Sequence, residues 1–399
     1  MTVALSVVGV RPNFIKLAPL HKPLARNFRH VIVHTGQHYD YEMSKIIFEH
    51  LGIPRPDYNL EVGSGPQGYQ SGEMVKRVEE VLLKEKSDLV IVYGDTNSTL
   101  AGALASVKLR SPVAHIEAGL RSYDMKMPEE VNRLITDQVS QYLFAPTQAA
   151  VKNLKREQVQ GKICLSGDVM VEVLKDTLQV AEGRSKALDK LELKSKQYLL
   201  ATIHRAENTD TKQRLTSIVQ ALTKINEIIV FPAHPRTKKA LQQFNLYNQI
   251  RALTNVKLIE PLGYVDFINL ERNAKKIITD SGGVQKEAYL LGIPCITLRD
   301  RTEWIETVRE GWNILVDVNV SAILDAVEKF SPSKPRKRIF GEGRASEKIV
   351  EILHNNFARQ SCRRTEPLVK GYVTSICRFW RQAKSLQNPR RGRLRFKSC

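Results

Sequence analysis

Short apolar runs alternate with amphipathic stretches along most of this chain. The runs cover residues 3–8, 30–34, 89–93, 113–117 and 142–145 in the first half, and 198–203, 228–232, 256–259, 276–279, 295–298 and 314–316 in the second. They are apolar throughout rather than alternately polar, which is typical of parallel strands covered on both faces. The stretches between them have a helical pattern and supply the crossovers. The pattern therefore predicts an α/β protein.

The apolar runs fall into two groups, so we expect two Rossmann-like, doubly wound domains that face a central cleft. Residues 176–196 are charged and helical in pattern, and the strand pattern restarts at Tyr198, which places the boundary within residues 168–197. We predict domains over 1–170 and 171–340, a helix over 341–355 and a basic tail over 356–399. Ligands of such sheets bind beyond the carboxyl ends of the strands.

The 399 residues include no apolar stretch long enough to span a bilayer. The apolar start of the chain has no basic region before it and no small-residue cleavage site, so we expect a buried strand there and a cytoplasmic protein. The five cysteines are odd in number, and no two have the spacing of metal ligands. We predict neither a disulfide framework nor a metal site, and we expect Cys164 and Cys295 to be core residues.

Much of the net charge of +19 lies at the C-terminal end. Residues 358–399 hold twelve basic side chains and one acid, Glu366. Such a composition has little capacity to form a core, so we expect this tail to be disordered. Contact with nucleic acid or anionic lipid is an alternative, and an extension from a shifted reading frame is another.

The segment from Asp280 to Gly283 follows an apolar run and precedes a helical stretch. A strand that turns directly into a helix presents free backbone N–H groups and the positive end of the helix dipole. The turn Ser281-Gly282-Gly283 therefore suits an anion, and glycine lets a phosphate approach the backbone closely. An ordinary strand–helix turn explains the segment equally well.

A second turn, Gly9-Val10-Arg11-Pro12, follows the first apolar run. Arg11 precedes the helix expected there and Lys16 lies in its first turns, so both could bind a pyrophosphate; the alternative is a solvated helix start. The chain has neither Gly-x-Gly-x-x-Gly nor a Walker sequence here, which disfavours nicotinamide and ATP chemistry.

Three carboxylates follow strands or start helices in the first half: Asp95, Glu117 and Glu130. Asp95 could be a helix N-cap, and Glu129 and Glu130 could stabilise the first turn of a helix that begins at Pro128. Glu117 is harder to explain in this way, because an acid at the end of an apolar strand is costly unless it is paired. Carboxylates that converge at strand ends can form an acid/base set.

Histidines follow two strands of the second half. His204 precedes Arg205 and Glu207 and has a suitable proton affinity to move a proton, although a single histidine can equally be structural. His234 precedes a proline and could simply cap the next helix. A further charged segment, from Arg299 to Glu303, follows the apolar run at 295–298 and is expected at the same edge of the sheet.

Together these segments resemble the non-hydrolysing UDP-N-acetylglucosamine 2-epimerase family over about residues 1–353, with an archaeal-like segment after Gln37-His38. The segments that carry the resemblance, in family order, are Gly9-Val10-Arg11-Pro12, Thr35-Gly36-Gln37-His38, Tyr93-Gly94-Asp95-Thr96, His115-Ile116-Glu117-Ala118-Gly119-Leu120-Arg121, Pro128-Glu129-Glu130-Val131-Asn132-Arg133, His204-Arg205-Ala206-Glu207-Asn208, Asp280-Ser281-Gly282-Gly283 and Arg299-Asp300-Arg301-Thr302-Glu303.

The resemblance implies a fold like that of B-type glycosyltransferases, a homodimer, a nucleotide-sugar substrate, a role in polysaccharide biosynthesis, and no metal or other cofactor. It implies elimination of UDP to an enzyme-bound 2-acetamidoglucal, followed by re-addition to the epimer. The implied catalytic residues are Asp95, Glu117, Glu130 and His204, and the implied substrate-binding residues are Arg11, Lys16, Arg133, Ser281, Gly282, Gly283, Glu287 and Arg299.

The chain departs from the family pattern at several positions. Tyr39 and Asp40 stand where several bacterial members bind a second, activating substrate molecule, which puts such activation in doubt. Arg301 and Ile305 replace a small residue and a proline of another loop. A glycosyltransferase of the same fold, a hydrolysing epimerase that releases N-acetylmannosamine, and a nucleic-acid-binding protein are the competing functions.

Overall fold

The computed structural model describes residues 1–37, 48 and 51–364. Residues 1–350 form one compact unit that contains two β-sheets, and a second unit begins at Glu351. Every pair of neighbouring strands in both sheets is parallel. The α/β class with two Rossmann-like sheets, expected from the continuous apolar runs, is confirmed.

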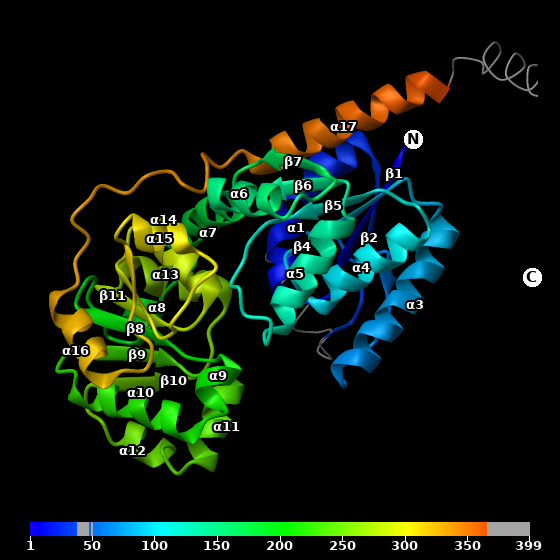
Figure 1. The fold of residues 1–399 in the computed structure, drawn as a ribbon. Coiled ribbons are helices and arrows are strands. Elements are labelled where there is room, and N and C mark those ends of the chain that lie inside the picture. Colours follow the sequence, from blue (N-terminus) through cyan, green and yellow to red (C-terminus); the bar gives the residue numbers. More distant parts are fainter. Residues whose placement is uncertain (38–47, 49–50, 365–399) are drawn as a thin grey trace, which may run out of the picture. The chain divides into compact units, whose positions relative to one another are not determined.

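The first sheet has seven strands in the order β3-β2-β1-β4-β5-β6-β7 (Figure 1). They are β1 (Val3–Val8), β2 (Arg29–His34), β3 (Tyr58–Asn59), β4 (Leu89–Tyr93), β5 (Val113–Ile116), β6 (Tyr142–Ala145) and β7 (Lys162–Leu165). The chain first adds strands on one side of β1 and then continues on its other side with β4. The strand order therefore reverses between β1 and β4, which is where a doubly wound sheet opens a crevice for ligands.

The second sheet has six strands in the order β10-β9-β8-β11-β12-β13. They are β8 (Tyr198–Thr202), β9 (Ile228–Pro232), β10 (Val256–Ile259), β11 (Lys276–Thr279), β12 (Cys295–Thr297) and β13 (Asn313–Leu315). The same reversal occurs here between β8 and β11. The two apolar runs that precede His204 and Ser281 are thus neighbours in the sheet.

Helices cover both sheets. Those of the first half are α1 (Arg11–Asn27), α3 (Gln67–Glu85), α4 (Asn97–Lys108), α5 (Pro128–Val139), α6 (Gln148–Arg156) and α7 (Met170–Arg184). Those that follow are α8 (Ala187–Lys190), α9 (Ala206–Thr209), α10 (Lys212–Lys224), α11 (Pro235–Gln243), α12 (Tyr247–Arg251), α13 (Tyr264–Asn273), α14 (Gly282–Leu291), α15 (Ile305–Arg309), α16 (Val320–Lys329) and α17 (Ala345–Arg364). Among the described residues, no helix is both long and apolar enough to cross a membrane.

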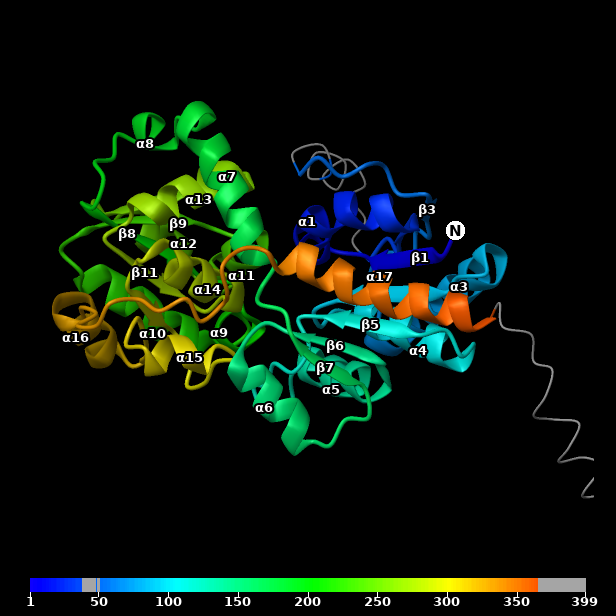
Figure 2. The same ribbon diagram turned by 90° about the horizontal axis from the view of Figure 1, so that it is seen from above.

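The second sheet shows why its strands are apolar throughout. Successive side chains of a strand point to opposite faces. Leu199 packs in one cluster with Leu215 of α10, while Leu200 packs in another with Leu270 of α13. Figures 1 and 2 show α10 on one side of this sheet and α8 and α13 on the other.

Two short edge strands, β3 and β7, were not predicted. β3 has two residues, and in β7 two residues are exposed and two half-buried. An edge strand has a neighbour on one side only, so its sequence need not be continuously apolar. The expectation that Cys164 is a core residue is wrong for the same reason, because it is half-buried on β7, whereas Cys295 on β12 is buried as expected.

The last helix differs from the expected span of 341–355. It begins at Ala345, because Gly341 and Gly343 before it have φ values of +88° and +80°, which are not helical. It continues to Arg364, the last residue that the structure describes, since residues 345–364 contain neither proline nor glycine. Residues 356–364, which we had assigned to the tail, are therefore helical. The rest of the tail, 365–399, lies outside the described residues, as do Tyr39 and Asp40.

The start of α17 is attached to the first sheet and to α7. The backbone N–H of Ser346 donates to Glu172 at 2.9 Å, and Nζ of Lys348 donates to the carbonyl of Leu165 at 2.5 Å. Residues 330–344 connect α16 to this point, and the carbonyl of Phe340 accepts from the N–H of Asp168 at 2.9 Å. This connection holds the loop after β7, which carries Asp168.

Candidate active site

Several of the predicted site residues lie at the two places where strand order reverses. In the first sheet, Arg11 and Lys16 follow β1, and Asp95 follows β4. In the second sheet, His204 follows β8 and Ser281 follows β11. The carboxyl ends of parallel strands meet at one edge, so these residues gather there although the sequence separates them widely.

Glu117 follows β5 and is buried with its carboxylate between two lysines. Its Oε1 lies 3.0 Å from Nζ of Lys16 in α1, and its Oε2 accepts from Nζ of Lys286 in α14 at 2.9 Å. Burial raises the pKa of Glu117, but the two ammonium groups more than offset this and lower the pKa to about 2. The expectation that a buried acid here must be paired is confirmed. The solvated-helix explanation of Lys16 is wrong, since Lys16 is itself buried.

The backbone of Glu117 is left-handed, with φ of +72°. Its N–H and that of Ala118 both donate to the carbonyl of Phe144, at 3.1 and 3.0 Å, which fixes this conformation. A non-glycine residue held this way costs on the order of 1–3 kcal/mol, and such strain clusters at functional sites. A Cβ built on Gly94 would lie 3.0 Å from Nζ of Lys16 and 3.6 Å from Oε1 of Glu117. The glycine before Asp95 thus makes room for the Lys16–Glu117 pair.

Asp95 and Glu130 are brought together by Arg133. The buried guanidinium donates from Nη1 to Asp95 at 3.0 Å and from Nη2 to Glu130 at 2.8 Å. The alternative that Asp95 is the N-cap of the following helix is wrong. The cap of α4 is Thr96, whose hydroxyl accepts from the N–H of Thr99 at 3.3 Å.

Glu130 is buried and accepts more hydrogen bonds than Asp95. Besides Arg133, its donors are the N–H and hydroxyl of Ser122 and the N–H of Tyr123, each at 2.9 Å. These contacts order the loop that precedes α5 rather than cap the first turn of α5. Since both carboxylate oxygens are occupied, Glu130 has a clear structural role in this conformation.

At the second sheet, Asp280 organises the loop after β8. It accepts from the N–H groups of His204 and Arg205 and from Nδ2 of Asn208, each at 3.0 Å. Burial lowers the pKa of His204, and Asp280, 3.9 Å from its Nδ1, opposes that shift. The ring of His204 lies 5.7 Å from that of His234. His234 caps α11 by accepting from the N–H of Arg236 at 3.2 Å, as its capping explanation predicted.

Ser281 is the N-cap of α14, and within the described residues its side chain makes no capping hydrogen bond. A Cβ built on Gly282 would lie 3.4 Å from Oε2 of Glu303 and 3.9 Å from Nη2 of Arg205, whereas one on Gly283 would meet no atom closer than 3.8 Å. The helix N-terminus therefore has no side-chain cap, and both the Arg205 guanidinium and the Glu303 carboxylate lie beside it. Free N–H groups at a helix start suit an anion.

Arg299 lies near this turn, and carboxylates of the protein already occupy its guanidinium. It is buried and donates to Glu303 at 3.1 Å and to Glu207 at 3.0 Å. Glu303 also lies 3.9 Å from Nη2 of Arg133. The chain Asp95–Arg133–Glu303–Arg299 therefore connects the ends of the first sheet to those of the second.

Arg11 and Glu287 are connected by Tyr264. The guanidinium of Arg11 lies 5.4 Å from the centre of the Tyr264 ring, and the hydroxyl of Tyr264 donates to Glu287 at 2.8 Å. Burial raises the pKa of Glu287, although the Tyr264 bond and the charge of Arg11 oppose it. Nearby, Glu271 is fully buried, and its pKa is raised well above the ordinary value by burial and by Glu287.

Four residues of this network were not predicted as site residues: Lys286, Asp168, Asp280 and Glu303. Lys286 lies one turn into α14 and donates to Asp168 at 2.7 Å as well as to Glu117. Asp168 could not be found from the strand pattern, because it follows β7, a strand that the sequence did not predict.

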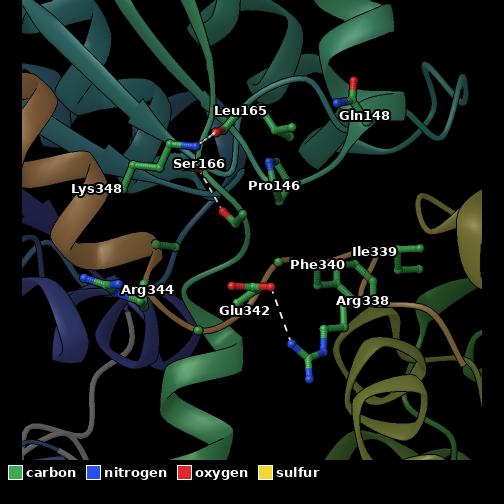
Figure 3. Close-up of a pocket in the computed structure, with 14 residues that line it drawn as sticks. Pro146, Gln148, Leu165, Ser166, Arg338, Ile339, Phe340, Glu342, Arg344 and Lys348 are labelled. Atoms are coloured by element: carbon green, nitrogen blue, oxygen red, sulfur yellow. Dashed lines mark hydrogen bonds and ion pairs between the residues drawn. The ribbon is translucent and has the colours of Figure 1, made fainter.

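A pocket of about 410 Å³ lies beside the loop after β7, and its lining includes Phe340, whose carbonyl accepts from the N–H of Asp168 (Figure 3). It is formed by the end of β7 and the segment before α17, and its charged lining residues are Arg338, Glu342, Arg344 and Lys348. Lys348 donates to the carbonyl of Leu165, and Arg338 lies 3.4 Å from Glu342. Among the described residues there is no cluster of three side chains with the character of metal ligands.

Two parallel, doubly wound sheets with charged residues gathered at the carboxyl ends of their strands define the class of this protein as an α/β protein with two Rossmann-like sheets. The sequence model for UDP-N-acetylglucosamine 2-epimerase matches residues 22–354. This chain belongs to the UDP-N-acetylglucosamine 2-epimerase family.

Individual relatives agree with this assignment. A UDP-N-acetylglucosamine 2-epimerase homolog of Methanococcus maripaludis is 56% identical, covering 88% of this chain and 99% of the relative. A UDP-2,3-diacetamido-2,3-dideoxy-D-glucuronate 2-epimerase of Pseudomonas aeruginosa is 46% identical, covering 88% and 98%. The crystal structure of the Methanocaldococcus jannaschii UDP-GlcNAc 2-epimerase in complex with UDP-GlcNAc and UDP superposes with a TM-score of 0.83 at 48% identity, covering 89% of this chain and all of that one.

Proposed function

We propose that this chain epimerises UDP-N-acetylglucosamine at carbon 2 to UDP-N-acetylmannosamine, reversibly and without hydrolysis. The observation that carries the proposal is the pairing of buried, ionised Glu117 with Lys16 and Lys286, next to Gly94 and Asp95 and in contact with α14. It combines a carboxylate that can accept a proton with cations that can stabilise a diphosphate.

The chemistry needs these two features together. The proton on carbon 2 is not acidic, because no carbonyl lies beside that carbon. Departure of UDP builds positive charge at carbon 1 and makes the neighbouring proton acidic. A carboxylate then takes this proton, and 2-acetamidoglucal and UDP remain bound. Return of a proton to the opposite face and re-addition of UDP give the epimer.

The proposed residue roles are those that the family resemblance implies. Asp95, Glu117 and Glu130 are the proposed acid/base carboxylates, with His204 on the proton path. Arg11, Lys16, Arg133 and Arg299 are the proposed cations for the substrate. Ser281, Gly282 and Gly283 would hold the diphosphate on the N-terminus of α14, and Glu287 would contact the ribose. Of these roles, that of Glu130 competes with its structural contacts.

The test is incubation with UDP-N-acetylglucosamine in heavy water, followed by NMR. We expect deuterium at carbon 2 and a mixture of the two UDP-sugars. Release of free N-acetylmannosamine would identify the hydrolysing reaction instead. Sugar loss that requires an added acceptor would identify a glycosyltransferase. A folded sample that exchanges nothing under any of these conditions excludes the proposal.

A second substrate has a specific reason to be included. The Pseudomonas aeruginosa relative, at 46% identity, acts by its name on UDP-2,3-diacetamido-2,3-dideoxy-D-glucuronate. The same elimination and re-addition would epimerise carbon 2 of that sugar. Competition between equimolar UDP-sugars in heavy water gives the ratio of kcat/KM values, and we expect UDP-N-acetylglucosamine to exchange faster.

Four further expectations belong to the proposal. The division at residues 170 and 171 assigns the carboxylates to one domain and UDP to the other. The homodimer implied by the family can be tested by sedimentation. A cytoplasmic location and a role in polysaccharide biosynthesis remain predictions.

A further inference from the structure

The proposed function treats Lys286 as one of two cations beside Glu117, and the surroundings of Lys286 indicate a more specific role. Its Nζ lies between two carboxylates, 2.7 Å from Oδ2 of Asp168 and 2.9 Å from Oε2 of Glu117, and 4.5 Å from the centre of the Trp304 ring. The side chain is 3% exposed, so these groups replace water around the ammonium. A buried charge is retained at such a point only if it is paired, and here it is paired twice.

Glu117 has a cation on each oxygen. Lys16 occupies Oε1 at 3.0 Å, and Lys286 occupies Oε2 at 2.9 Å. A carboxylate held in this way is a weak proton acceptor, because both ammonium groups favour its ionised form. For Glu117 to take a proton from a sugar, one of the two lysines has to leave it.

The two lysines differ in what else holds them. Lys286 is also bonded to Asp168, and Asp168 is itself held in place. The N–H of Asp168 donates to the carbonyl of Phe340 at 2.9 Å, and Oδ1 of Asp168 accepts from the N–H of Met170 at 2.8 Å. Lys16 forms an ion pair with Glu117 alone among the described residues. Lys16 is thus the lysine that an incoming diphosphate can draw away.

We propose that Lys286, anchored by Asp168, is a positioning residue that keeps Oε2 of Glu117 fixed while the substrate diphosphate draws Lys16 off Oε1 and frees that oxygen to accept the proton of carbon 2. This inference rests on the proposed function. The C–H electron pair becomes the second bond between carbons 1 and 2, the C1–O bond breaks, and its electron pair leaves with UDP. The proton ends on Oε1 of Glu117.

The experiment compares two buried lysines that are both replaced by methionine. Lys286→Met removes the positioning charge. Lys276→Met is the matched control, because Lys276 is also buried but donates to the carbonyls of Ala326 and Val327, away from the site. Isotope exchange and epimer formation are measured as a function of pH for both variants and for the unmodified protein.

For Lys286→Met we expect kcat to fall by roughly 10²-fold or more, with KM changed only a few-fold, because the loss affects the proton transfer. The acidic limb of the kcat profile should move to higher pH by about one unit or more, since a cation that favoured ionised Glu117 is gone. In Lys276→Met the acidic limb of the kcat profile should stay at the pH of the unmodified protein, even if the unfolding temperature of the variant falls.

Two more variants guard against misfolding of Lys286→Met. Lys286→Arg retains the charge, so it should keep the limb in place while kcat falls through altered geometry. Asp168→Asn removes the anchor, so it should lower kcat less than Lys286→Met does. The inference is overturned if Lys286→Met or, should that not fold, Asp168→Asn has the unmodified profile and rate. Absence of exchange by the unmodified protein would instead overturn the proposed function.

Discussion

Arg133 donates to Asp95 from its Nη1 at 3.0 Å, and through this bond the end of β4 is connected to α5. The same guanidinium holds Glu130, so two carboxylates predicted to be catalytic share one cation. Their surroundings nevertheless differ: the Asp95 side chain is 29% exposed and the Glu130 side chain 1%. This difference separates a group that can meet a substrate from one that mainly supports a loop.

Replacing Asp95 by asparagine should therefore reduce activity with little cost to the fold. We expect kcat to fall by roughly 10²-fold or more, the usual contribution of an acid/base group. The free energy of unfolding should change by less than about 1 kcal/mol, because the ion pair is partly exposed. Epimerisation rates and urea unfolding measure the two effects, and a large loss of stability would argue against this assignment.

Glu130→Gln should reduce the stability of the fold more clearly than Asp95→Asn does. The neutral amide cannot accept from Arg133 and the Ser122–Tyr123 loop as the carboxylate does, so we expect a loss of about 1–3 kcal/mol in unfolding free energy. Glu129→Gln, a change at the neighbouring half-buried acid, is the control and should leave stability within about 0.5 kcal/mol. If Glu130→Gln is inactive but fully stable, the acid/base role is the better explanation.

Gly283→Ala tests the diphosphate turn. Position 283 is exposed at the start of α14, and an added Cβ would meet no atom closer than 3.8 Å, so the fold should tolerate alanine and could gain up to about 1 kcal/mol. A phosphate on the helix N-terminus would meet that methyl group. We expect the Kd for UDP to rise by about tenfold, equivalent to about 1.4 kcal/mol. Calorimetric titration gives this value, and an unchanged Kd would place the diphosphate elsewhere.

Arg11→Met should weaken UDP binding. Arg11 is exposed at the start of α1 and lies against Tyr264, so its guanidinium is available to a phosphate. A hydrogen bond to a charged group contributes about 1.5–3 kcal/mol, so we expect a roughly 10- to 150-fold rise in Kd. Arg26→Met, at the exposed end of the same helix, is the control for loss of charge alone. Equal effects of both variants would indicate general electrostatics rather than a contact.

His30 should make the fold sensitive to mild acid. Burial, with a smaller contribution from His21, lowers the pKa of His30 to about 3, and its Nε2 lies 2.8 Å from the hydroxyl of Ser6. The unfolded chain binds a proton near pH 6.5 and the folded chain does not, so stability falls as the pH drops from 6.5 towards 3. The loss is at most about 1.4 kcal/mol per pH unit.

Unfolding of the unmodified protein and of His30→Gln between pH 7 and pH 4.5 measures this contribution. The variant lacks the titrating ring, so its stability should fall less steeply over this range. Parallel slopes for the two proteins would show that His30 does not contribute.

The sequence predicted the positions of the strands best where a strand is buried on both faces. The apolar runs located β1, β4 and β11 because strands buried on both faces have to be apolar at every position. The prediction was weakest at the edges: β7 is half-exposed, so it carried no such pattern, and Asp168 behind it was missed. The helix α17 also runs past its predicted end, because proline and glycine are absent from residues 345–364, where the pattern of charges suggested a tail.

Sequence alone determined which residues end the strands, and hence that Lys16, Asp95, Glu117 and Ser281 would gather at two edges. The sequence also required a partner for Glu117, because a charge at the end of a buried strand is costly wherever its partner comes from. Only the tertiary structure decided the partners. Lys286 reaches Glu117 from 169 positions away, and Glu130 is occupied by the loop before its helix. The pairing of Lys286 with Glu117 depends on how the two sheets approach each other, and no periodicity along the chain encodes that distance.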